Sequence, residues 1–266
     1  MPNFRTIEIS DPRFESNGLR HITVKSNNLK SRGDISVFVP KGSDHHDLPI
    51  VLLLHGVYGS HWSWSQKTGV HLKMQSWIEN QQLVPMILAM PSDGLWGDGS
   101  GYLPHQLANF EKWITEDVVN ATIEMVPQAT DHSRLFIAGL SMGGFGALRI
   151  GAKYGSKFSA ASGLSSITGL DQMKLFIEED LELLRQKEVE NESVFDTIIK
   201  YRKNLPKIRF DCGLSDALLS YNRKLHQQLN QHAVPHSYVE SPGDHDWAYW
   251  EEHIMDTLLF FNNIIK

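Results

Sequence analysis

Short apolar runs and longer helical patterns alternate along most of the chain. Several of the runs are hydrophobic almost throughout, which is typical of strands that are covered on both faces. The seven runs are 35–39, 50–54, 86–90, 134–138, 158–164, 207–212 and 236–240. Apolar residues at helical spacing are clearest in 105–127, beginning at Leu107, and in 246–265. This alternation predicts an α/β fold with a mostly parallel central sheet and helices on both faces.

Two parts of the chain depart from this alternation. The first 40 residues contain strand-like runs without a helical crossover, so we expect an antiparallel entry to the sheet. Residues 167–204 are longer than a crossover requires and carry nine acidic and six basic side chains. Their apolar residues recur at helical spacing: Leu175, Phe176, Leu183, Leu184, Val194 and Ile198. We expect a helical insertion, either a lid over the carboxyl edge of the sheet or a longer surface crossover with a solvated face.

No repeat or linker-like tract interrupts residues 1–266, which we expect to form a single domain.

The composition excludes several classes of function. The 266 residues include 25 basic and 31 acidic side chains, a formal net charge of −6. Nucleic-acid binding depends largely on clustered Lys and Arg, so we expect no nucleic-acid partner. The single cysteine, Cys212, excludes an internal disulfide and a CxxC site, and we interpret it as a packed strand residue. With no apolar run of roughly 18 residues and no start typical of a signal peptide, we expect a cytoplasmic protein without a membrane partner.

The most informative motif is the G-x-S-x-G sequence at 139–143, GLSMG. It directly follows the apolar run that ends at 138 and precedes a plausible helix. A serine hydroxyl becomes a good nucleophile only when a base removes its proton and its oxygen is exposed. A tight strand-to-helix turn would project Ser141 from the edge of the sheet, and the two glycines let neighbouring backbone approach closely. We therefore predict that Ser141 is a catalytic nucleophile.

This motif resembles the nucleophile motif of the α/β-hydrolase superfamily. It is most similar to the Putative esterase branch, with esterase D, tributyrin esterases, and feruloyl and acetylxylan esterases. Four further segments resemble that branch: LLLHGVYGSHWSW (52–64), MPSDG (90–94), CGLSDALLSYNRKLHQQL (212–229) and SPGDHDWAYWEEHI (241–254). The resemblance extends from about residue 50 to the end of the chain. It implies the α/β-hydrolase fold and a serine esterase with the chain order nucleophile, acid, histidine.

Position in the chain selects the base and the acid. His245, one of thirteen histidines, lies between the last apolar run and the C-terminal helix, where the superfamily order places the histidine. Asp216 follows the run 207–212 and matches the C-G-x-x-D block of the branch, although it could also cap the next helix. We expect His245 to be the general base and Asp216 the carboxylate that orients it. The competing carboxylates lie within the strand or beside the histidine: Asp211, Asp244 and Asp246.

A tetrahedral intermediate also needs two donors aimed at its oxygen. The backbone N–H of Met142, directly after the nucleophile, is one expected donor. The resemblance implies the second at Val57, in a loop that we expect His55 to shape. Four aromatic residues at the same edge could line an acyl or alcohol pocket or could be packing: Trp62, Trp64, Trp96 and Trp247. No HExxH, P-loop or GxGxxG pattern occurs, so we expect neither a metal nor a cofactor.

These residues together predict a carboxylic-ester hydrolase that works through an acyl-enzyme on a small-molecule ester, either short-chain or carbohydrate-linked. Two alternatives stay open. An S-formylglutathione hydrolase would use the same chemistry on a thioester, although CGLSD at 212–216 differs from the esterase D pattern. A non-catalytic binding scaffold on the same fold predicts a defective triad, whereas all three residues are present here. The sequence leaves the oligomeric state open.

Overall fold

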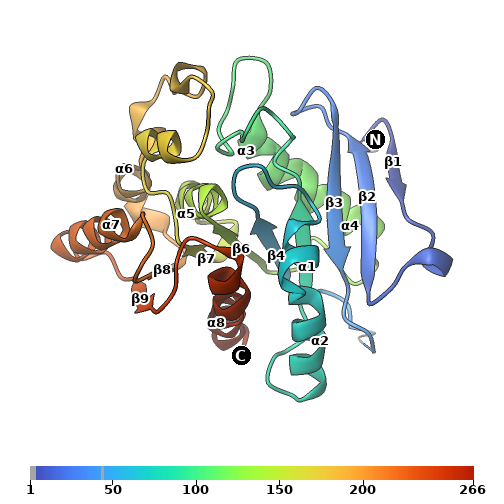
Figure 1. Cartoon of the computed structure of the whole chain (residues 1–266). Helices are drawn as coiled ribbons and strands as arrows, with labels where there is room; N and C mark the ends of the chain where they lie inside the picture. The colour runs from blue at the N-terminus through green and yellow to red at the C-terminus, as the bar shows by residue number, and fades with distance from the viewer. Residues whose placement is uncertain (1–3, 43–44) are drawn as a thin grey trace.

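The computed structural model describes residues 4–42 and 45–266, and these residues build one sheet of nine strands (Figure 1). The strand order is β1-β2-β3-β5-β4-β6-β7-β8-β9. The strands are β1 (Ile7–Ile9), β2 (Leu19–Lys25), β3 (Arg32–Phe38), β4 (Ile50–Leu54), β5 (Ile87–Pro91), β6 (Leu135–Leu140), β7 (Phe158–Leu164), β8 (Lys207–Gly213) and β9 (Ser237–Ser241). Neighbours from β1 to β5 in this order pair antiparallel, and those from β5 to β9 pair parallel.

The predicted fold class is therefore confirmed. All seven apolar runs are strands, β3 to β9, and the first 40 residues form an antiparallel entry as expected. The reason is clearest in β4, in which every residue is fully buried. Ile50, Leu52 and Leu54 pack into the core on one face of the sheet, and Val51 and Leu53 pack into the core on the other. A strand covered on both faces has no polar position to alternate with its apolar ones.

Helices cover both faces, as the alternation predicts (Figure 1). One face is covered by α1 (Ser63–Thr68), α2 (Val70–Glu79) and α8 (Trp247–Ile265). The other is covered by α3 (Phe110–Lys112), the π-helical turn η2 (Trp113–Val118), α4 (Val119–Met125), α5 (Met142–Lys153), α6 (Val194–Lys200) and α7 (Leu219–Gln231). Because the strands from β5 to β9 run in the same direction, their carboxyl ends all lie at one edge of the sheet.

The helix expected over 105–127 begins later than predicted. Asn109 caps it, because its side chain accepts a hydrogen bond from the N–H of Lys112 at 2.9 Å, and the helix begins at Phe110. Leu107 precedes this cap and its side chain is 85% exposed, so its place in the apolar spacing was coincidental.

The insertion 167–204 is less helical than predicted. It consists of the short 3-10 turns η3 (Leu170–Leu175), η4 (Leu181–Leu183), η5 (Val189–Glu192) and η6 (Arg202–Asn204), with α6 as its one α-helix. Asp180 and Ser193 each accept a backbone N–H from two or three residues ahead, which starts a new turn in place of extending the last one. Leu184, Val194 and Ile198 are buried as expected, whereas Leu175 and Leu183 are exposed.

Candidate active site

Ser141 occupies the turn between β6 and α5, and the turn is strained. Its backbone angles are φ 53° and ψ −118°, a conformation that costs a residue with a side chain on the order of 1–3 kcal/mol. A Cβ on Gly139 would lie 2.3 Å from the backbone of Gly143, and a Cβ on Gly143 would lie 2.3 Å from the carbonyl oxygen of Leu54. Both glycines of the motif are therefore required by the close approach of the backbone.

The structure brings Ser141, His245 and Asp216 together at the carboxyl edge of the sheet. His245 lies on the loop between β9 and α8, and its Nε2 is 3.0 Å from the Oγ of Ser141. Its Nδ1 is 2.9 Å from the Oδ2 of Asp216, which follows β8. The side chain of Asp216 is fully buried and that of His245 is 15% exposed. The three residues form one continuous hydrogen-bonded chain.

The protonation of Asp216 decides the direction of these hydrogen bonds. Burial by itself would raise the pKa of this carboxyl, but the hydrogen bond and charge of His245 and the N–H of Leu218 outweigh it and lower the pKa. Asp216 is therefore a carboxylate, which can only accept hydrogen bonds. Nδ1–H of His245 donates to it, so Nε2 of the neutral ring is left to accept the hydroxyl proton of Ser141.

The competing carboxylates are all engaged elsewhere. Asp211 forms an ion pair with Arg209 and accepts the hydroxyl of Tyr249 at 2.9 Å. Asp244 accepts the N–H of His245, and Asp246 caps α8. Asp216 does not cap α7, whose N-cap is Leu218, but its Oδ1 accepts the N–H of Leu218 at 2.7 Å in the turn before that helix. Cys212, next to this group, is a fully buried strand residue, and burial raises the pKa of its thiol.

The two expected oxyanion donors are next in sequence to residues of the nucleophile turn and of the loop after β4: Met142 follows Ser141, and Val57 follows Gly56. Met142 is the first residue of α5, so its N–H has no acceptor within the helix. A Cβ on Gly56 would lie 3.4 Å from the Cβ of Ser141, which places the loop after β4 against the nucleophile turn. His55 shapes that loop: its Nδ1 bonds the carbonyl of Gly56 at 2.6 Å, and its Nε2 accepts the N–H of Asp93 at 3.0 Å.

The four tryptophans have separate surroundings. Trp64 is 1% exposed and donates its indole N–H to the carbonyl of Leu54, so it is a core residue and does not line a pocket. Trp247 is half-buried and packs edge-on against Trp64, and Trp62 is 42% exposed. Trp96 lines a cavity of about 780 Å³ between loop 104–107 and the insertion, and Ser141 is not among the residues that line this cavity.

The sequence patterns did not identify two aromatic residues that lie beside His245. The ring of Phe176 stacks on the imidazole with centroids 4.8 Å apart, and Trp250 packs against it at 88° with centroids 5.0 Å apart. The apolar spacing of the insertion does include Phe176, but spacing along one segment carries no information about a partner on a distant loop. Trp250 lies in 246–265, where the apolar spacing indicates a helix and does not indicate a contact with His245.

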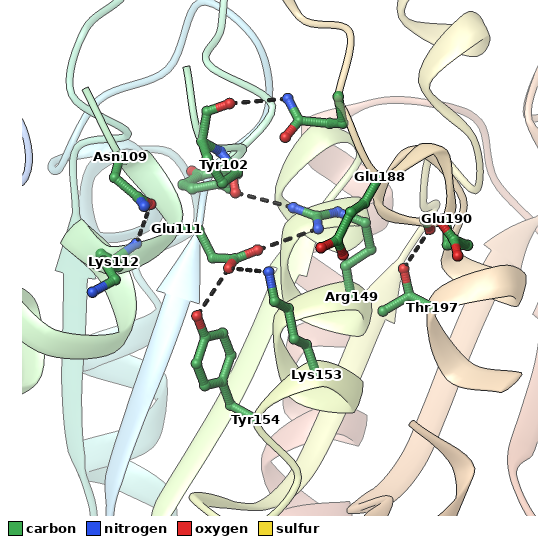
Figure 2. Close-up of polar contacts among 12 residues, drawn as sticks. Tyr102, Asn109, Glu111, Lys112, Arg149, Lys153, Tyr154, Glu188, Glu190 and Thr197 are labelled. Carbon is green, nitrogen blue, oxygen red and sulfur yellow. Dashed lines mark hydrogen bonds and ion pairs between the residues drawn. The ribbon is translucent and has the colours of Figure 1, made fainter. Parts of the chain in front are cut away.

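The far end of α5 carries a second buried polar cluster (Figure 2). The carboxylate of Glu111 lies 3.4 Å from Nη1 of Arg149, 2.7 Å from Nζ of Lys153 and 2.9 Å from the hydroxyl of Tyr154. Arg149 is fully buried and also donates to the carbonyl of Tyr102 at 3.1 Å. The hydroxyl of Tyr102 donates in turn to the carbonyl of His55 at 3.0 Å, so this cluster supports the loop that carries Val57.

The fold and the strand-turn-helix setting of Ser141 are those of an α/β-hydrolase. The family described as "Putative esterase" matches residues 26–261, and the chain belongs to it. The predicted resemblance and the predicted class, a serine carboxylic-ester hydrolase, are confirmed.

Three similar proteins bear on this class. An acetyl esterase of Caldicellulosiruptor saccharolyticus is 26% identical over 242 residues, 84% of this chain and 87% of that protein. A ferulic acid esterase structure has a TM-score of 0.80 and 23% identity, covering 99% of this chain and 100% of that one. The S-formylglutathione hydrolase FrmB of Staphylococcus aureus has a TM-score of 0.77 and 19% identity, covering 96% and 100%.

Within residues 4–42 and 45–266, no helix is long and apolar enough to cross a membrane. The same residues include no group of three or more His, Cys, Asp or Glu side chains that could hold a metal ion.

Proposed function

We propose that Ser141, His245 and Asp216 are the catalytic triad of an ester hydrolase that works through an acyl-enzyme. The observation that carries this proposal is the hydrogen-bonded chain from Ser141 Oγ through both ring nitrogens of His245 to Asp216, with distances of 3.0 and 2.9 Å. Ser141 Oγ attacks the ester carbonyl carbon while Nε2 of His245 takes the hydroxyl proton. Asp216 keeps the ring in the required tautomer and stabilises the imidazolium.

The tetrahedral intermediate carries its charge on the former carbonyl oxygen. We assign the N–H groups of Met142 and Val57 to this oxygen. The intermediate breaks its bond to the alcohol oxygen, which takes the proton from His245, and the acyl group remains on Ser141. A water then attacks the acyl carbon and gives a proton to His245. That proton returns to Ser141 Oγ as the carboxylic acid leaves.

For the substrate, we propose short-chain or carbohydrate-linked acyl esters. The acetyl esterase and the ferulic acid esterase to which this chain is similar support this class by their names. The likeness to the ferulic acid esterase and to FrmB extends to the fold alone, so feruloyl esters and S-formylglutathione are both members of a substrate panel. The intact hydrogen-bonded chain counts against the non-catalytic scaffold.

The test combines a fluorophosphonate probe with that panel. Wild type should be labelled and should hydrolyse p-nitrophenyl acetate, and Ser141→Ala should do neither. Across acetyl, feruloyl and S-formylglutathione substrates, we expect the highest kcat/KM with an oxygen ester. Labelling that persists in Ser141→Ala would refute the assignment of the nucleophile. A preference for S-formylglutathione would favour the thioester alternative, and a wild type that neither reacts nor hydrolyses would favour the scaffold.

A further inference from the structure

The insertion 167–204 reaches the proposed base itself. Phe176, the residue after η3, lies almost parallel to the imidazole of His245, with 22° between the planes and 4.8 Å between the centroids. Trp250 of α8 packs against the same imidazole at 88°. The ring of His245 is thus confined by one aromatic side chain from the insertion and one from the C-terminal helix, in addition to its two hydrogen bonds.

Hydrogen bonds fasten the segment 176–179 to the two loops beside the site. The hydroxyl of Tyr58 donates to the carbonyl of Phe176 at 2.7 Å, and it lies 3.2 Å from the Oδ2 of Asp98. The same Oδ2 accepts the N–H of Glu178 at 2.8 Å, and the N–H of Asp98 donates to the Oε1 of Glu179 at 2.7 Å. The N–H of Glu178 and the hydroxyl of Tyr58 lower the pKa of Asp98, so this acceptor is charged.

These contacts also fix the loop that carries the second proposed oxyanion donor. Tyr58 directly follows Val57 and has a φ of 57°, a conformation that is uncommon for a residue with a side chain. Its N–H donates to the carbonyl of Asp98 at 2.8 Å, which holds the peptide plane in this orientation. One set of contacts therefore links the Val57 loop to the aromatic ring that lies on His245.

We propose that Phe176 and Tyr58 are positioning residues for the reaction, an inference that rests on the triad proposed above. Phe176 holds the imidazole of His245 in line with Ser141, and Tyr58 ties Phe176 to the loop of Val57. A displacement of about 1 Å at a reacting group can cost on the order of 10²-fold in rate. Loss of these contacts should therefore lower kcat, in contrast to an insertion that only selects esters by size.

Three substitutions separate the contacts. Phe176→Leu keeps an apolar side chain and removes the aromatic face, whereas Phe176→Tyr keeps that face. Tyr58→Phe removes one hydroxyl and leaves the ring. The matched control is Phe195→Leu, because Phe195 lies in the same insertion and also packs against a histidine, His232, with centroids 5.1 Å apart. This control makes the same chemical change at an aromatic pair that does not include His245.

Each variant is measured for kcat and KM on p-nitrophenyl acetate and butyrate, for the rate of fluorophosphonate labelling and for Tm. Phe176→Leu should lower kcat and the labelling rate by about tenfold while KM changes by less than about twofold. Tyr58→Phe should lower both rates by a smaller factor, and Phe176→Tyr and Phe195→Leu should stay near wild type. Because labelling involves no ester, it reports on the activation of Ser141 independently of the ester pocket.

Two results would overturn the inference. One is an unchanged kcat and labelling rate in Phe176→Leu. The other is a change in KM that depends on acyl length with unchanged labelling, which would make Phe176 a pocket wall. If Phe176→Leu does not fold, Tyr58→Phe provides the test of the inference, because this substitution preserves the packing of the aromatic ring at residue 58. Failure of the proposed function has a different signature, since wild type itself would then not be labelled at Ser141.

Discussion

Helix α5 has a polar cluster at each end, and the two clusters differ in what their hydrogen bonds connect. At its start, Ser141 contacts one nitrogen of the imidazole of His245, and the other ring nitrogen contacts Asp216. At its end, Arg149 and Lys153 share the carboxylate of Glu111, and two of the three charges are permanent cations (Figure 2). One cluster joins a nucleophile to its proposed base, and the other is a set of ion pairs.

The number of donors explains the difference. Glu111 accepts hydrogen bonds from three side chains, and one of them, Lys153, lies in the last turn of α5, where positive charge is favourable. This cluster binds a neighbouring segment, because Arg149 also donates to the carbonyl of Tyr102. Asp216 accepts from one backbone N–H and one ring nitrogen, and the far nitrogen of that ring faces the nucleophile. The hydrogen-bonded chain at the start of α5 therefore ends at the Oγ of Ser141, a potential nucleophile. The cluster at the far end of α5 contains no such atom.

The largest effect should come from breaking the proton path. Ser141→Ala and His245→Ala should each lower kcat by on the order of 10⁶, and the double variant should lose no more than either, because residues that act as a unit are not additive. Steady-state kinetics of the three variants on p-nitrophenyl acetate test this. Losses that multiply in the double variant would mean that the two residues act independently.

Removing the charge of the orienting acid should have the next largest effect. Asp216→Asn keeps the shape but no longer holds Nδ1–H of His245, and we expect kcat to fall by on the order of 10⁴. Asp244→Asn is the matched control, because Asp244 is exposed and accepts only its neighbour's backbone N–H. An inactive Asp244→Asn beside an active Asp216→Asn would reverse the assignment.

The far end of α5 should respond in stability and not in chemistry. Glu111→Gln leaves the buried guanidinium of Arg149 without its counter-charge, which should lower the free energy of unfolding by about 3–5 kcal/mol. Below the new Tm, kcat should stay within a few fold of wild type. The exposed pair Lys112–Glu116 supplies the control, since Lys112→Gln should cost less than about 1 kcal/mol. Denaturant unfolding measures both, and equal effects would contradict the distinction between the clusters.

Acid should produce the smallest of these effects. The pKa of Asp216 is lower in the folded chain than its ordinary value of about 3.9. Its contribution to stability is therefore present above that ordinary value and is lost as the pH falls through the folded-state pKa. Asp216→Asn has no such titration, so wild type should lose Tm relative to this variant on acidification from about pH 5 to pH 3. If the Tm of wild type instead rose relative to that of Asp216→Asn on acidification, the expected direction of the effect would be wrong.

Local pattern was enough for the sheet and for the nucleophile turn. A strand buried on both faces, such as β4, must be apolar throughout, and the glycines around Ser141 are required by contacts within one turn and its neighbouring strand. The strand ends, together with the chain order and the C-G-x-x-D block implied by the resemblance, were also enough to place Asp216 and His245 at one edge, because parallel strands end together there. The contact between these two residues was thus predictable without coordinates.

Only the tertiary structure decided how the remaining residues are used. Trp62 and Trp64 are near neighbours in sequence, yet Trp62, at the N-cap position before helix α1, is exposed, whereas Trp64 is a core residue of that helix. Phe176 meets His245 across distant parts of the chain, at the end of a short 3-10 turn within a segment for which the apolar spacing predicted longer helices. Periodicity reports which side of an element is apolar. Which distant side chain it contacts depends on how the whole chain packs.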